Sequence, residues 1–189
     1  MFVNIKDTEK VYFNSCENCL DNCCSAPMVM LAPLVLNDFL YVYKRFLIQF
    51  AYINDELKAV MVINRGTGSC SYYENNRCKI YEQRPPACKM FPISPYFNEF
   101  YIYSSCSALS SNENFGEFIC DSENINDKFL HPRVNNFIKK LETTKEFLEE
   151  IKNDLTPSIK ISDIQLFNYN GNITDNQYIE MYKESLLYL

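Results

Sequence analysis

The sequence contains no tryptophan, one histidine and four glycines, and these shortages argue against several kinds of catalytic site. With His131 as the sole histidine, a Ser-His-Asp arrangement has almost no candidates. The scattered glycines give no nucleotide-binding loop, and the turn at Arg65–Ser69 lacks the Gly-Lys-Ser/Thr ending of a phosphate loop. The Cys-x3-Cys-x2-Cys spacing of radical S-adenosylmethionine enzymes is also missing, so no familiar catalytic motif stands out.

Basic residues are also scarce. The chain has 18 Lys and Arg against 24 Asp and Glu, a net charge of −6 and a pI near 4.9, which argues against a nucleic-acid partner. The longest nearly apolar run, Ala26–Leu36, is too short to cross a bilayer. The opening MFVNIKDTEK lacks the basic and apolar regions of a secretory signal. We therefore expect a cytoplasmic protein with no membrane partner.

Cysteine, by contrast, is abundant, and eight of the nine cysteines form one pattern. They are Cys16, Cys19, Cys23, Cys24, Cys70, Cys78, Cys88 and Cys106. In a reducing cytosol, dense thiols indicate metal binding or catalysis rather than disulfides, and an odd total does not suit a closed disulfide set. A redox dithiol at Cys16 and Cys19 remains an alternative, although we find no βαβ context for it. The pattern favours a metal site.

The spacing indicates how the thiolates could be used. The two residues between Cys16 and Cys19 allow one turn to present both sulfurs to one ion, whereas the adjacent Cys23 and Cys24 tend to point in different directions. Eight thiolates suit two four-cysteine sites or one polynuclear cluster. Such ligands select zinc, iron–sulfur or cuprous copper. We expect neither His131 nor Cys120 to be a ligand.

Charged side chains surround the second cysteine group. Four basic residues lie there beside two acidic ones: Arg77, Lys79, Arg84 and Lys89, with Glu74 and Glu82. A locally basic stretch would offset thiolate charge, although most such residues belong to solvated loops. Arg84 is the exception, because the Arg-Pro-Pro sequence fixes it in a turn between two cysteines.

The periodicity predicts an α+β fold with a small cysteine-rich, loop-rich metal-binding core, several amphipathic helices and few short strands. We expect helices at 39–50 and 132–152, a last helix ending near Leu187, and a buried strand at 58–63. The predicted organisation is a cysteine-cluster domain at 1–120 and a helical C-terminal region at 121–189 packed on it. The last helix packs within the molecule or binds a protein partner.

The cysteine pattern also resembles a known family. Cys-x2-Cys-x3-Cys-Cys, followed by Cys78-Lys-Ile-Tyr-Glu-Gln-Arg-Pro-Pro-Ala-Cys88-Lys-Met-Phe-Pro, is similar to the CxxCxxCC cysteine-cluster proteins over residues 13–107. These are zinc- or iron-chelating proteins with eight characteristic cysteines. The resemblance implies that the eight patterned cysteines coordinate zinc or an iron–sulfur or polynuclear iron centre, and that Cys120 does not.

One departure from the family pattern suggests an alternative function. Three residues, Leu20-Asp21-Asn22, precede the double cysteine where the family has two. That longer gap is similar to the flagellin lysine methylases, which share the cysteine domain. The alternative is therefore an S-adenosylmethionine-dependent protein lysine methyltransferase. The sequence leaves open the metal, the number of ions, the division of cysteines between sites and whether there is catalysis.

Overall fold

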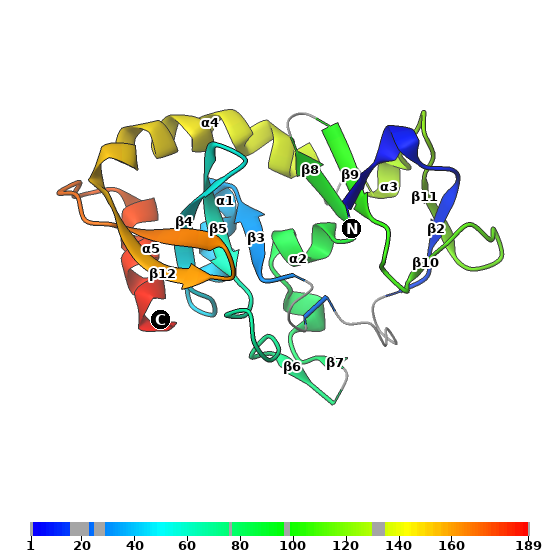
Figure 1. Cartoon of the computed structure of the whole chain (residues 1–189), viewed down its shortest axis with the longest axis horizontal. Helices are drawn as coiled ribbons and strands as arrows, with labels where there is room; N and C mark the ends of the chain where they lie inside the picture. The colour runs from blue at the N-terminus through cyan, green and yellow to red at the C-terminus, as the bar shows by residue number, and fades with distance from the viewer. Residues whose placement is uncertain are drawn as a thin grey trace. The chain divides into compact units, whose positions relative to one another are not determined.

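The computed structural model describes residues 2–15, 23–24, 29–75, 77–96, 99–129 and 135–188 (Figure 1). It has an α+β fold, as the sequence predicts. The chain forms two compact units. The first unit comprises Met1–Cys23 and Tyr72–Lys139, and the second comprises Cys24–Ser71 and Lys140–Leu189. No described helix has the length and apolar character needed to cross a membrane.

The first unit is built from short antiparallel strands. One sheet has the order β1 (Phe2–Asn4), β9 (Glu99–Tyr103) and β8 (Ile93–Tyr96), and another has β10 (Leu109–Ser110), β2 (Val11–Phe13) and β11 (Glu117–Cys120). The strands β6 (Tyr73–Glu74) and β7 (Arg77–Cys78) form a small hairpin. The helices are α2 (Pro86–Met90), α3 (Asp127–Phe129) and the 3-10 turns Ile5–Asp7 and Tyr81–Gln83.

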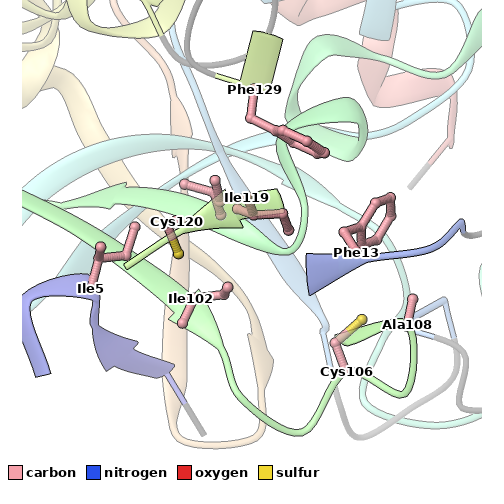
Figure 2. Packing of buried hydrophobic residues seen from close by; sticks show 9 residues of the cluster. Ile5, Phe13, Ile102, Cys106, Ala108, Ile119, Cys120 and Phe129 are labelled. Atoms are coloured by element: carbon pink, nitrogen blue, oxygen red, sulfur yellow. The ribbon is translucent and has the colours of Figure 1, made fainter. Parts of the chain in front are cut away.

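An apolar cluster forms the core of the first unit. Figure 2 shows Cys120 among Ile5, Ile102 and Ile119, all of which are buried. The rings of Phe13 and Phe129 meet edge to face, with centroids 5.9 Å apart, an arrangement that aromatic rings prefer. This cluster gives the first unit an apolar source of stability in addition to any metal site.

The second unit contains a five-stranded antiparallel sheet. Its order is β12 (Leu155–Ile161), β13 (Ile164–Tyr169), β4 (Ile48–Ile53), β5 (Glu56–Val62) and β3 (Leu31–Leu34). The turn joining β4 to β5 is Asn54-Asp55, whose φ angles of 50° and 62° suit a two-residue hairpin. Pro33 and Pro157 both lie in edge strands, where a missing N–H is tolerated.

Helices complete the second unit. They are α1 (Leu36–Val42), α5 (Gln177–Ser185) and the part of α4 (Asn135–Ile151) that follows Lys139. A 3-10 turn follows α5 at Leu186–Tyr188, and another follows α4 at Lys152–Asp154. Phe39 of α1 contacts the rings of Phe147 and Tyr178 edge to face. Tyr182 of α5 is fully buried and packs on Phe50 of β4. The apolar faces of these helices are therefore used inside the unit.

The structure corrects two expectations about secondary structure. Strands are not few, because the described residues form thirteen of them in four sheets. The segment 39–50 is not one helix, because α1 ends at Val42 and β4 begins at Ile48. The side chains from Ile48 to Ala51, the polar Gln49 included, are all fully buried. A strand that is buried on both faces lacks the alternation of apolar and polar residues that distinguishes a strand from a helix. The predicted division at residue 120 stays a prediction.

Asp38 is a buried carboxyl at the start of α1. It is 4% exposed and its Oδ2 accepts a hydrogen bond of 3.0 Å from the backbone N–H of Val35. Burial raises the pKa of Asp38 from its ordinary value of 3.8 to about 6, despite the opposing effect of that hydrogen bond. Thr144 stabilises the same turn, because its Oγ1 accepts from the N–H of Leu36 at 3.1 Å.

The raised pKa predicts a pH-dependent stability. The folded protein binds the Asp38 proton more tightly than the unfolded chain does, so this contribution is complete below about pH 4 and is lost as the pH rises through about 6. Relative to Asp38→Asn, which does not titrate, the wild type should gain up to about 3 kcal/mol of unfolding free energy between pH 7 and pH 4. Urea titrations of both proteins would measure this difference, and a difference independent of pH would contradict it.

Candidate metal centre

Six of the eight predicted ligands lie in the described residues, and Cys16 and Cys19 lie outside them. Cys24 and Cys70 belong to the second unit, whereas Cys23, Cys78, Cys88 and Cys106 belong to the first. Cys70 and Cys106 are buried, and the other four are half-buried. His131, which we expect not to be a ligand, also lies outside the described residues.

Backbone contacts bring Cys24 and Cys70 together within the second unit. The N–H of Cys70 donates to the carbonyl of Cys24 at 2.7 Å. The segments on either side are joined as well, because the N–H of Ile63 donates to the carbonyl of Met30 at 2.9 Å and Asn64 Nδ2 donates to the carbonyl of Val29 at 3.1 Å. The backbones of Cys24 and Cys70 thus lie side by side, although the two residues are far apart in the sequence.

The turn between Ile63 and Cys70 depends on a glycine. Asn64 is only 6% exposed, and its Oδ1 accepts from the N–H of Gly66 at 3.0 Å. Gly66 has a φ of 84°, which other residues rarely adopt. The side chain of Asn64 and the glycine together guide the chain toward Cys70.

Cys78 and Cys88 lie on two short elements of the first unit. Cys78 is in β7, opposite Tyr73 in β6, and the turn includes Asn75 with a φ of 51°. Cys88 is in the one-turn helix α2, where its N–H donates to the carbonyl of Pro85 at 2.9 Å. Proline at the first helical position suits this start, because it has no N–H to leave unpaired. The two cysteines are therefore held on hydrogen-bonded backbone.

Cys106 and Cys120 both belong to the apolar cluster of the first unit. Figure 2 shows Cys106 beside Ala108, and its N–H donates to the carbonyl of Tyr103 at 3.0 Å. Cys120 is fully buried, and desolvation raises its pKa to about 11, with a hydrogen bond to Thr8 acting in the opposite direction. Cys120 is therefore a buried thiol, in keeping with the expectation that it packs in the core.

The structure distinguishes the basic side chains near Cys78 and Cys88. Lys79 forms an ion pair with Glu74, while Arg77 and Lys89 are exposed. The Arg84 guanidinium lies over the Tyr81 ring, with its central carbon 3.7 Å from the ring centroid, and its Nε donates to the Tyr81 carbonyl at 2.9 Å. Sequence reasoning selected Arg84 but missed Tyr81, which the three-residue spacing between an aromatic residue and an arginine in a turn would have indicated.

Within the described ranges, no three His, Cys, Asp or Glu side chains gather as a metal site. Those ranges contain neither Cys16 nor Cys19, which are the closest chelating pair in the sequence. The complete ligand set therefore stays a prediction. What the described residues do provide is a set of half-buried and buried thiols at hydrogen-bonded positions, and such soft donors suit zinc or iron.

Comparison with known protein families gives one match. Residues 15–117, more than half of the chain, match the model of the family CxxCxxCC, described as “Putative zinc- or iron-chelating domain”. The chain belongs to the CxxCxxCC family. The CxxCxxCC match covers all eight patterned cysteines and ends before Cys120. Searches of curated proteins and of solved structures gave no match.

Proposed function

We propose that this protein binds zinc or an iron centre through Cys16, Cys19, Cys23, Cys24, Cys70, Cys78, Cys88 and Cys106. Membership of a zinc- or iron-chelating family supports the choice of metal. The observation that supports the ligand set most directly is the 2.7 Å hydrogen bond from the N–H of Cys70 to the carbonyl of Cys24. It joins the backbones of two of these cysteines that are separate in the sequence.

Metal binding would add stability rather than replace the apolar core. Each unit already buries an apolar cluster among its described residues, so the fold does not depend wholly on the ion, as a small zinc finger does. A zinc ion held by four thiolates would carry a formal charge of −2, and it would tie together the segments that carry its cysteine ligands. An iron–sulfur cluster would supply electron transfer in addition.

Elemental analysis of protein purified without oxygen tests the proposal. We expect zinc or iron to copurify in amounts of at least about one ion per chain, because thiolate sites bind these metals tightly. Iron with equimolar sulfide and a brown colour would identify a cluster, and a colourless zinc protein would identify zinc–thiolate sites.

The matched control is the same protein after exposure to air, in which lost metal and new disulfides would indicate oxidation of the site. Metal-free protein from the oxygen-free preparation, with no uptake of added Zn²⁺ or Fe²⁺, would contradict the proposal. The methyltransferase alternative stays a prediction, because neither the fold nor the family match tests it.

A further inference from the structure

Arg84 is a preorganised cation. Stacking on Tyr81 and the 2.9 Å bond from Nε to the Tyr81 carbonyl fix the plane of its guanidinium. The backbone is restrained too, because two prolines follow directly and Pro85 is buried. These contacts use the ring face and one N–H, and an arginine has five N–H donors. The outer nitrogens, Nη1 and Nη2, are thus presented in a fixed geometry.

No carboxylate lies within ion-pair distance of Arg84 among the residues that the structure describes. This is notable in a chain whose acidic residues outnumber its basic ones, 24 to 18. Arg84 is also half-buried. A half-buried guanidinium of restrained geometry, with no acidic partner among those residues, is suited to bind an anion.

Arg84 lies between Cys78 and Cys88 in the chain, and this position suggests that the anion is a metal-bound thiolate. Arg84 stacks on a residue three positions after Cys78, and its own backbone leads directly into α2, which carries Cys88. Both cysteines are in the first unit. Thiolates bound to zinc or iron retain negative charge, and groups that hydrogen-bond to ligating atoms tune metal affinity.

We propose that Arg84, held by Tyr81, is a positioning residue that balances the negative charge of the metal–thiolate centre and so raises its metal affinity. The inference rests on the proposed function, and it assigns to Arg84 a role that the other basic residues of the stretch do not share. Lys79 is already paired with Glu74, and Arg77 is an exposed side chain without a restraining aromatic ring among the described residues.

Zinc affinity, measured by competition with a chromophoric zinc chelator, tests this role in the full-length chain. Arg84→Gln should bind Zn²⁺ about 10-fold more weakly than the wild type, which is the lower end of the effect of groups around metal ligands. Arg84→Lys keeps the charge and should recover part of that loss. Arg77→Gln removes the same charge one residue from Cys78 and should change the affinity less than about 2-fold, because exposed charges interact weakly through water.

The salt dependence separates charge balance from a packing defect. The ratio of wild-type to Arg84→Gln affinity should fall between about 0.05 M and about 0.5 M salt, because counterions screen electrostatic interactions. Equal effects of Arg77→Gln and Arg84→Gln, or a ratio that salt leaves unchanged, would overturn the role of Arg84 while zinc binding itself stands. Absence of zinc and iron binding by the wild type would instead overturn the proposed function, and this inference with it.

Discussion

Replacing Cys88 with alanine is expected to remove bound metal, whereas replacing Cys120 with alanine is expected to leave it in place. Cys88 is half-buried in α2 and lies inside the family match, while Cys120 is fully buried in the apolar cluster and lies beyond it. Loss of one thiolate ligand should lower metal affinity by more than about 100-fold, since even groups around the ligands contribute 10- to 100-fold.

The two variants should also differ in stability, and for different reasons. Part of the metal-binding energy is folding energy, so Cys88→Ala should lower the melting temperature of metal-loaded protein and remove most of its sensitivity to a chelator. Cys120→Ala should lose about 1 kcal/mol from a smaller buried side chain and should keep its sensitivity to the chelator.

Metal content per chain and melting curves with and without EDTA would measure these effects. Equal loss of metal from Cys120→Ala would show that the wrong eight cysteines were selected. Full metal content in Cys88→Ala would remove Cys88 from the ligand set.

Local sequence patterns predicted some elements well. The run Lys58–Ile63 was expected as a buried strand, and β5 spans Glu56–Val62. β-branched and other apolar residues between polar ends are typical of such a strand. The long helix expected at 132–152 corresponds to α4, which is described from Asn135. In both cases the segment's own residues determine its structure.

The elements that sequence analysis missed depend on distant partners. The sequence analysis predicts no strand near residue 157, yet Pro157 lies in β12, which pairs with β13 at the edge of the described sheet. The pairing of β13 with β4 joins residues near 166 to residues near 50, and no local pattern encodes such a register. The region 121–189 therefore contains a hairpin as well as helices.

In the candidate site, too, some features follow from the local sequence and others depend on distant residues. The cysteine spacing was sufficient to identify the family, because chelation and family membership are properties of the sequence. The backbone contact between Cys24 and Cys70 could not be predicted from the sequence, because it depends on the hydrogen bonds of Asn64 and the turn at Gly66. The stacking of Arg84 on Tyr81 could have been predicted from the sequence, because both residues lie in one turn.

Deletion of residues 157–189, which form most of the β12–β13 hairpin and the last helix, is expected to cause a large loss of stability. This deletion removes β13, α5 and most of β12 from the second unit. Five buried hydrophobic side chains of this segment would be lost: Ile161, Leu166, Tyr169, Ile179 and Tyr182. At about 1.5–3 kcal/mol for each buried side chain, the loss is comparable with the whole stability of a typical domain, about 5–15 kcal/mol.

Hydrogen bonds would be lost with the apolar contacts. The N–H of Ile48 donates to Ser185 Oγ at 3.1 Å, and Gln49 Nε2 donates to Asn168 Oδ1 at 2.9 Å. After the deletion, β4 would become an edge strand with Phe50 and Ala51 uncovered. Exposed apolar edge strands pair with other chains, so the shortened protein should aggregate or unfold without a cooperative transition.

Light scattering, thermal melting monitored by circular dichroism and metal content would test this expectation. The control is Leu187→Ala, which shortens a side chain that is 83% exposed and should change the melting temperature by only a few degrees. Because Cys24 and Cys70 belong to the same unit as the deleted segment, the long deletion should also lower metal content. A soluble protein that lacks 157–189 and keeps its metal and melting temperature would show instead that this segment is a docking element rather than part of the core.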